Sequence, residues 1–353
     1  MYILKITQTK NTEKSTVNNQ TPTPSITTIP KPFLIKGSIP YWDQEEAIKS
    51  FEENVSVFNY VNLFWYFLGS DGSVMKYTYA NEDQSIIDFA HANNVKVSAV
   101  ITNLPEGSGS WSSKREKNVI SNEEVRQKHI ENIVEKLEEF NFDGVIIDYE
   151  LLKPNTREEY SNFIRELSQA LYRENKILTV VLHPKTGEKV KGEEISAYQD
   201  WEALSKYSDQ LQIMGYSEHT DEDPPGPIAG VDWIEKIIEY AKSKNIALEK
   251  LFLGIPLYGY DWNKNSSFPA KGLTFANVQN LLAIYNVSEE WDEKSDSPHF
   301  DYGTSHEVWF ENARSVEEKI KLAKESGLAG VTFWRLGGED PKIWEIVKKY
   351  RLP

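Results

Sequence analysis

Eight short apolar runs recur along the chain from Phe33 onward, and segments with helical periodicity separate them. Runs of four to eight residues rich in β-branched and aromatic side chains predict buried strands, whereas apolar positions at three- and four-residue intervals predict amphipathic helices. Clear helical segments are residues 122–140 and 157–175, and Asn155 and Thr156 predict an N-cap for the second. The apolar runs are FLIKGSIPYW, VNLFWYFL, VKVSAVITNL, FDGVIIDYE, ILTVVLHP, QLQIMGYS, LFLGIPLYGY and AGVTFWRLG.

This alternation of strands and helices predicts an α/β fold. Eight strands with intervening helices over about 320 residues favour a closed (β/α)8 TIM barrel over an open sheet. One connection is too long for a plain turn, because over fifty residues lie between Tyr258 and Arg314 and include strand-like pieces such as HEVWFE. We therefore predict a barrel over residues 33–353, with a small α+β insertion after strand 7 at about residues 259–312.

The first 32 residues have a different composition. From Thr7 to Pro32 the chain is rich in Thr, Asn, Lys, Ser and Pro and has almost no large apolar residue. Such a segment cannot bury enough surface to offset the entropy of ordering, so we predict a disordered tail or linker over residues 1–32. Residues 1–6 contain one Lys and a very short apolar stretch, which is too little for the hydrophobic region of a signal peptide.

Composition and charge exclude several classes of function. The formal net charge is −15 without a Lys/Arg cluster, which argues against nucleic acid as a partner. No apolar run approaches the ~20 residues of a membrane span, and the absence of cysteine removes disulfides and thiolate chemistry. The chain has 10 Trp, 18 Tyr and 15 Phe, whose flat faces suit sugars, although most of them are expected in the core. We expect a monomer without a cofactor.

The fourth apolar run carries the most specific chemistry. Side chains alternate along a strand, so Ile146, Asp148 and Glu150 share one face, and the two acids point into the barrel mouth where TIM-barrel chemistry occurs. Carboxylates at positions i and i+2 lie roughly 6–7 Å apart, so ionisation of one raises the pKa of the other. A protonated Glu beside an ionised Asp suits acid-catalysed cleavage of an acetal. Alternatively, the acids cap helices or pair with Lys or Arg.

The string DGVIIDYE resembles the DxxDxDxE signature of glycoside hydrolase family 18. Asp143, Asp148 and Glu150 match its first, third and fourth acidic positions, and Ile146 replaces the second. QLQIMGYSEH resembles the family's MxYD stretch on strand six, and GVTFW resembles its final strand. The resemblance extends from Phe33 to the C-terminus. The closest resemblance within the family is to the spore cortex-lytic branch of N-acetylglucosaminidases, and the stretches that carry it include LGIPLYGYDW and WDEKSDSPHF.

The resemblance implies substrate-assisted retaining catalysis, in which the substrate's own acetamide oxygen is the nucleophile. Glu150 would protonate the leaving oxygen, and Asp148 would orient the acetamide and stabilise the oxazolinium-like intermediate. Tyr216 would hold the acetamide carbonyl, and Trp334 would form the floor beneath the sugar. The implied substrates are β-1,4-linked N-acetylglucosamine glycans, in peptidoglycan or spore-cortex fragments first and in chitin second. The implied location is extracellular, or associated with the cell wall or the spore.

Further residues at or near strand ends are weaker candidates for substrate contact. With Asp143 from the signature, they are Trp42, Trp65, Asn103, Glu218 and Tyr258.

Two departures from the family pattern bear on Glu150. Ile146 cannot share a proton with Asp148, so Asp148 should lose a hydrogen-bonding partner and stay ionised more of the time. Ser217 stands where the MxYD pattern has Asp, which removes a charge that helps to set the pKa of Glu150. We expect slower activity or a shifted pH optimum.

Two alternatives need separate answers. The stretch HTDED at residues 219–223 lacks a second nearby His and precedes Pro-Pro-Gly, so we expect a solvated loop and no metal.

The competing function is a glycan-binding, lectin-like protein on a barrel that has lost catalysis. Ile146 and Ser217 favour that alternative, whereas retention of Glu150 opposes it.

Overall fold

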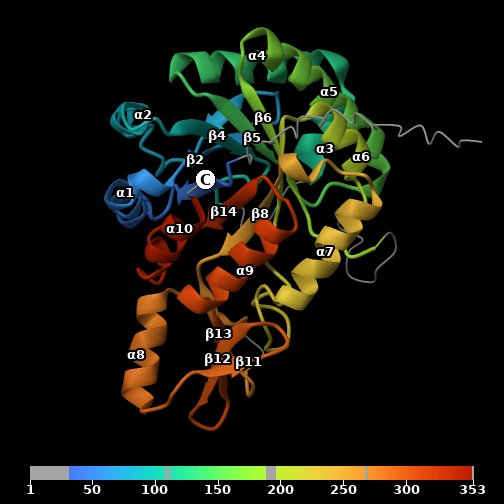
Figure 1. Cartoon of the computed structure of the whole chain (residues 1–353). Helices are drawn as coiled ribbons and strands as arrows, with labels where there is room; N and C mark the ends of the chain where they lie inside the picture. The colour runs from blue at the N-terminus through green and yellow to red at the C-terminus, as the bar shows by residue number, and fades with distance from the viewer. Residues whose placement is uncertain (1–31, 108–110, 112, 188–195, 267–268, 352–353) are drawn as a thin grey trace, which may run out of the picture. The chain divides into compact units, whose positions relative to one another are not determined.

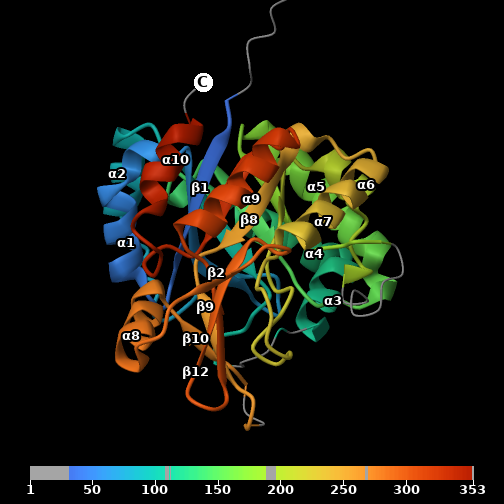
Figure 2. The same ribbon diagram turned by 60° about the horizontal axis from the view of Figure 1, so that its bottom comes forward.

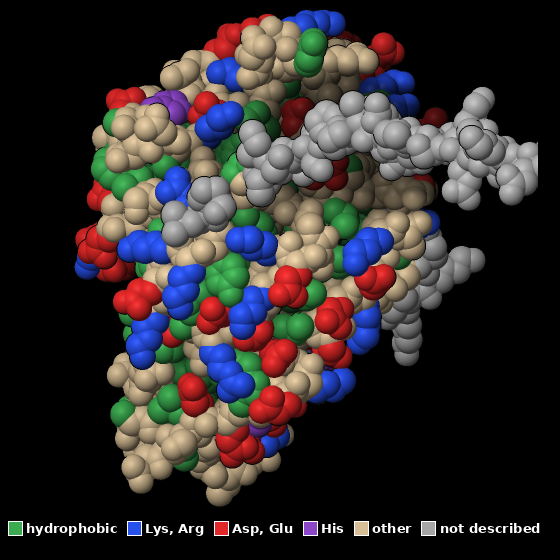
Figure 3. All heavy atoms as spheres, viewed as in Figure 1, with side chains coloured by type: hydrophobic (Ala, Val, Ile, Leu, Met, Phe, Trp, Pro, Cys, Tyr) green, Lys and Arg blue, Asp and Glu red, His purple; other side chains and the backbone are tan. Residues whose placement is uncertain are grey.

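The computed structural model describes residues 32–107, 111, 113–187, 196–266 and 269–351. Apart from Pro32, the segment that we expect to be disordered, residues 1–32, lies outside the described residues. In the described part, no helix is both long and apolar enough to cross a membrane. On the face in Figure 3, basic and acidic side chains are interspersed.

Eight parallel strands form a closed barrel (Figure 1), as the sequence predicts. Neighbouring strands follow the order β1-β14-β8-β7-β6-β5-β4-β2, and pairing of β1 with β2 closes the ring. A short β3, Val74–Lys76, pairs antiparallel with β2. Each apolar run of the sequence contains one barrel strand. The strands are β1 Leu34–Pro40, β2 Tyr60–Leu68, β4 Lys96–Thr102, β5 Gly144–Asp148, β6 Ile177–Leu182, β7 Gln210–Ile213, β8 Leu251–Pro256 and β14 Gly330–Trp334.

Helices surround the barrel (Figure 2). Their buried apolar side chains belong to the same core cluster as those of the strands. The helices of the barrel layer are α1 Gln44–Glu53, α2 Gln84–Ala92, α3 Ser113–Ser121, α4 Glu123–Glu139, α5 Arg157–Arg173, α6 Trp201–Tyr207, α7 Val231–Ser243, α9 Ala313–Glu325 and α10 Ile343–Arg351. Short 3-10 turns of the described residues include Val55–Val57, Pro154–Thr156 and Leu248–Lys250.

The two helices predicted most clearly begin in different ways. Asn122 caps α4, because its side chain accepts a hydrogen bond from the Val125 N–H at 3.2 Å. Thr156 occupies the predicted N-cap position of α5, but its side chain does not cap the helix. Asn155 and Thr156 belong to a 3-10 turn, and the Thr156 hydroxyl donates to the Lys153 carbonyl at 2.7 Å. This turn satisfies the Thr156 side chain before the helix begins.

We expect Asn122→Ala to lower the free energy of unfolding by about 1 kcal/mol, because the change leaves one N–H of the first turn of α4 without its side-chain acceptor. Urea unfolding followed by circular dichroism measures this loss. Asn122→Asp, which keeps an acceptor oxygen, is the matched control and should unfold near the wild-type midpoint. Equal loss in both variants would show that the cap contributes nothing.

The predicted α+β insertion follows the seventh barrel strand, β8. It extends from one end of the barrel in Figures 1 and 2 and contains a five-stranded antiparallel sheet in the order β10-β9-β13-β12-β11. Its own small core includes Val278, Phe300 and Phe310. The elements are β9 Gly259–Asn263, β10 Lys271–Leu273, α8 Phe275–Tyr285, β11 Glu290–Asp292, β12 Ser297–Tyr302 and β13 His306–Phe310.

Candidate active site

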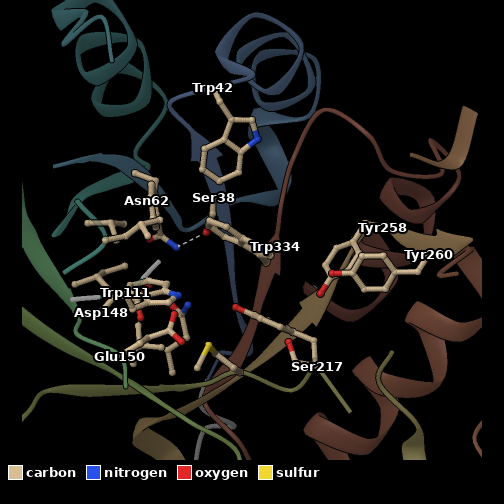
Figure 4. A pocket seen from close by; sticks show the side chains of 18 residues that line it. Ser38, Trp42, Asn62, Trp111, Asp148, Glu150, Ser217, Tyr258, Tyr260 and Trp334 are labelled. Carbon is tan, nitrogen blue, oxygen red and sulfur yellow. Dashed lines mark hydrogen bonds between the residues drawn. The ribbon is translucent and has the colours of Figure 1, made fainter. Parts of the chain in front are cut away.

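A pocket of about 350 Å³ opens at the carboxyl ends of the barrel strands (Figure 4). Seven of the eight barrel strands supply residues within their bounds, and the loops that follow the strands and β9 of the insertion supply the rest. The lining residues are Ser38, Trp42, Asn62, Phe64, Val100, Leu104, Trp111, Ile146, Asp148, Glu150, Val181, Gln212, Met214, Tyr216, Ser217, Tyr258, Tyr260 and Trp334.

Strand β5 brings the two acids into this pocket. Ile146, Asp148 and Glu150 all line it, as expected from side-chain alternation along the strand. Tyr149 points to the opposite side, where its hydroxyl lies 2.5 Å from His129 Nε2 in the buried layer beneath α4. The alternation therefore divides this short segment into a face for the pocket and a face for the core.

The backbone around Glu150 is held from two directions. The Asn103 amide forms a pair of hydrogen bonds with Glu150, accepting from its N–H and donating to its carbonyl, each at 2.7 Å. On the other side, the Tyr198 hydroxyl donates to the Tyr149 carbonyl at 2.5 Å. These contacts fix the chain just beyond the end of β5, so the backbone that carries the Glu150 side chain is held in place.

The two carboxyl groups lie in an environment that favours their protonated forms. Burial raises the pKa of Asp148 to about 7. Burial is also the larger cause that raises the pKa of Glu150 above its usual value, and the charge of Asp148 is the second. Desolvation thus outweighs the mutual repulsion on which the sequence argument depends. It also corrects the expectation that Asp148 stays ionised more of the time.

One oxygen of Asp148 has no compensating contact. Asp148 Oδ1 is buried and has no hydrogen-bond partner among the described residues. Ile146 on the same face offers only an apolar side chain, which agrees with the expected loss of a partner. A buried acceptor without a donor disfavours the charged form, and a substrate N–H would relieve that cost.

Tyr216 and Trp334 reach the same pocket from β7 and β14. Tyr216 follows the end of β7 and is 8% exposed, and its ring lies close to the β8 backbone. A Cβ at Gly254 would lie 2.9 Å from Cε1 of this ring and 2.6 Å from the Ile213 carbonyl oxygen, so glycine is required at that point of β8. Trp334 is the last residue of β14, and its ring lies 5.3 Å from that of Phe64.

Two of the weaker candidates also line the pocket. Trp42 is 48% exposed and lies edge-on to Trp334 with ring centroids 6.0 Å apart, so it offers exposed aromatic surface at the rim. Tyr258 lies on the opposite wall beside Tyr260 (Figure 4), and its hydroxyl hydrogen-bonds with Ser217. Ser217, at the position of the missing acid, therefore contacts the wall of the pocket.

Four other candidates lie outside the lining of this pocket. Trp65 is fully buried, and its indole N–H donates to Gln44. Asn103 is buried and holds the Glu150 backbone as described above.

The other two are acids used within the fold. Asp143 lies just before β5, at the opposite end of the barrel from Glu150, and accepts a hydrogen bond from the Val97 N–H. Glu218 accepts from the Gly230 N–H at the start of α7.

The sequence argument missed several residues that line the pocket. Asn62 and Gln212 have buried carbonyl oxygens without a hydrogen-bond partner among the described residues, so they could serve polar groups of a ligand. Alternation along the second and sixth runs would have placed both inside the barrel, because each lies two residues before another lining residue, Phe64 or Met214. Trp111 lies in the connection after β4, and no periodic signal indicates its position.

No group of three or more His, Asp or Glu side chains in the described residues is arranged to hold a metal ion. His219 contacts the Pro224 carbonyl, and Asp223 accepts two hydrogen bonds from Thr220, so this loop is held by its own internal contacts.

Comparison with known proteins identifies relatives over the barrel and the insertion. The family model for glycosyl hydrolases family 18 matches residues 37–339. A cortical fragment-lytic enzyme of Bacillus anthracis is 30% identical over 295 residues, which cover 82% of this chain and 67% of the relative.

Solved structures show the same fold. The spore cortex-lytic enzyme SleL of Bacillus megaterium QM B1551 has a TM-score of 0.82 and 28% identity, with 91% of this chain and 75% of that chain covered. A chitinase from Chromobacterium violaceum ATCC 12472 has a TM-score of 0.81 and 28% identity, with coverage of 91% and 99%.

Proposed function

This chain belongs to glycosyl hydrolase family 18 and is a glycosidase, and we propose that it cleaves β-1,4-linked N-acetylglucosamine glycans. One observation carries the proposal: Asp148, Glu150, Tyr216 and Trp334 come from three parts of the barrel and line one pocket. Two carboxyl groups and a tyrosine hydroxyl can supply acid–base catalysis and electrostatic stabilisation for cleavage of an N-acetylated sugar, and the tryptophan ring can support the sugar.

In the proposed first step, Glu150 gives its proton to the leaving glycosidic oxygen as the bond to the anomeric carbon breaks. The acetamide oxygen of the same sugar attacks that carbon from the other face and forms an oxazolinium ion. In the second step Glu150 takes a proton from a water molecule that adds to the anomeric carbon, and the acetamide is restored. The raised pKa of Glu150 supports this role, because the carboxyl group starts protonated.

Asp148 binds the acetamide group of the substrate in this proposal. Its unpartnered Oδ1 accepts the acetamide N–H, which orients the carbonyl oxygen toward the anomeric carbon and stabilises the positive charge of the intermediate. The Tyr216 hydroxyl donates to the acetamide oxygen, and the Trp334 ring supports the apolar face of the sugar. Trp42 and Tyr258 extend the contact surface beyond the reacting sugar.

The relatives support the choice of glycan. A cortical fragment-lytic enzyme and SleL are among them, so peptidoglycan of the spore cortex or fragments of it is the first substrate that we propose. The similarity to a chitinase keeps chitin as the second. We propose that the protein acts outside the cell, at the wall or on the spore.

A lectin is the second candidate, and Ile146 and Ser217 in place of two family acids favour it. It would bind chitooligosaccharides tightly and release no reducing ends at any pH between about 4 and 8. Retention of Glu150 and Asp148 in one pocket supports the enzyme instead.

The pH dependence of kcat/KM tests the proposed enzyme. Glu150 acts first as an acid, so the rate should fall as pH rises through its pKa, and this alkaline limb should lie well above pH 4.5 because burial and Asp148 raise that pKa. Release of reducing ends from chitooligosaccharides and peptidoglycan fragments, measured from about pH 4 to pH 9, gives the profile. An alkaline limb close to pH 4.5 would contradict the proposed acid, and no release at any pH would contradict the enzyme.

A further inference from the structure

A histidine that the proposed mechanism does not use lies behind Glu150. His183 follows the end of β6, and its Nε2 is 3.6 Å from Glu150 Oε2. The His183 side chain is only 5% exposed and does not line the pocket, so it faces the carboxyl group from the protein side. Its Nε2 is buried and has no hydrogen-bond partner among the described residues, which leaves this atom available to Glu150.

Several contacts fix the position of His183. Its backbone N–H donates to Gln199 Oε1 at 2.8 Å, and the Gln199 amide donates in turn to the Val181 carbonyl at 2.9 Å. The imidazole lies edge-on to Tyr198, with ring centroids 6.1 Å apart. Because Tyr198 also binds the Tyr149 carbonyl, one buried cluster holds both the histidine and the backbone that carries Glu150.

The surroundings keep this imidazole neutral. Burial, and then the charge of Lys185, lower the pKa of His183 to about 4. The other titratable groups that face Glu150 are Asp148 on the same strand, Tyr216 beyond β7 and Tyr198 before α6. The Tyr198 hydroxyl is already donated to the Tyr149 carbonyl. A neutral imidazole beside Glu150 can donate a hydrogen bond without adding a second charge.

We propose that His183 is a positioning residue for Glu150, and that one hydrogen bond from its Nε2–H orients the Glu150 carboxyl group and sets how tightly that group holds its proton. Its effect on catalysis rests on the function proposed above. The separation of 3.6 Å exceeds a normal hydrogen bond, and hydrogen bonds in ligand-free active sites are often long. The neighbouring strand β6 thus offers a polar partner in a site where Ile146 offers none.

The direction of the effect follows from hydrogen-bond strength. A bond from N–H to an ionised carboxylate is about twice as strong as a bond to a neutral acid, so His183 favours the ionised form of Glu150. It therefore opposes burial and Asp148, which favour the protonated form. Without His183, the pKa of Glu150 should therefore rise by about one unit. Glu150 would then be a weaker acid for the leaving oxygen of the first step.

The test compares wild type with His183→Phe and His183→Gln. Phenylalanine keeps a ring against Tyr198 but has no donor, whereas the glutamine amide restores a donor near Nε2. We expect the 13C-NMR titration of the Glu150 side-chain carboxyl, assigned with Glu150→Gln, to move up by about one pH unit in the Phe variant and to return toward wild type in the Gln variant. The alkaline limb of kcat/KM should move with it, while KM changes less than twofold.

The titration gives a readout that does not need turnover. Superimposed titrations of wild type and the Phe variant would overturn the role of His183, even if the enzyme is active. An inactive wild type would overturn the proposed function, and the titration would still decide the role of His183. If His183→Phe lacks a cooperative thermal transition, His183→Leu replaces it, with the same expected shift and the same contradicting result.

Discussion

Glu150→Gln should lower kcat/KM for the release of reducing ends by about 10²- to 10⁴-fold, the contribution that a positioned general acid and base makes. Glutamine has nearly the shape of glutamate, and the Asn103 amide binds the Glu150 backbone, so the fold around the position should persist. Binding of the oligosaccharide should change little, because Trp334 and the rest of the pocket are unaltered. The loss should therefore appear in kcat.

Glu218→Gln is the matched control for this prediction. Glu218 also stands at the barrel mouth, but its carboxylate accepts a hydrogen bond from the Gly230 N–H and does not line the pocket. A glutamine oxygen can keep that bond, so kcat/KM should stay within about twofold of wild type. Equal activity of Glu150→Gln and wild type would exclude Glu150 as the proton donor.

Asp148→Asn should have opposite effects on activity and stability. Loss of the carboxylate removes the group that stabilises the positive intermediate, so kcat should fall by about 10²- to 10³-fold. Stability should rise at alkaline pH, because the buried carboxylate and its unpartnered Oδ1 are costly when ionised. We expect a gain of about 1–3 kcal/mol in the free energy of unfolding at about pH 8.

The pH range of this gain follows from the pKa of Asp148. Burial raises that pKa from 3.8 to about 7 in the folded protein, so the folded state binds a proton more tightly than the unfolded chain. The favourable contribution is fully present below pH 3.8 and is lost as pH rises through about 7. Urea unfolding of both proteins at about pH 4 and pH 8 measures the difference. The same difference at both pH values would exclude a raised pKa for Asp148.

Asp143→Asn provides a control at the other end of β5. Asp143 accepts from the Val97 N–H and contacts His91, far from the pocket lining. The substitution should lower the free energy of unfolding because it weakens these contacts, whereas kcat of the folded protein should stay near the wild-type value. A loss of activity comparable to that of Asp148→Asn would contradict the separation of the two acids.

The barrel could be predicted because its strands are buried on both faces and therefore form continuous apolar runs. This pattern identified all eight strands, and the gap before β14 identified the insertion. Side-chain alternation also predicted that Ile146, Asp148 and Glu150 face the same side. These features depend on local periodicity, which the sequence carries directly.

The errors concern the direction of side chains near strand ends. Trp65 lies close to lining residue Phe64, but alternation turns it away from the pocket and a register shift follows between Phe64 and Tyr66. Asp143 belongs to a recognised motif, yet it precedes β5 and so lies at the end of the barrel away from the pocket.

Long-range contacts set the remaining features of the site. The contact of His183 with Glu150 joins two neighbouring strands, and the Asn103 contact joins β4 to the chain after β5. The pKa of Asp148 depends on how completely the closed barrel excludes water. No spacing in the sequence gives these distances or this degree of burial.

The most direct measurement is mass spectrometry of the products formed from a mixture of muropeptides and chitooligosaccharides, by wild type and by Glu150→Gln. The account predicts shortened glycans from wild type, with new ends at N-acetylglucosamine linkages, and unchanged oligosaccharides with the variant. Faster cleavage of the muropeptides would identify the cell wall as the substrate, and faster cleavage of the chitooligosaccharides would identify chitin. Intact glycans with wild type, or the same products from both proteins, would contradict a Glu150-dependent glycosidase.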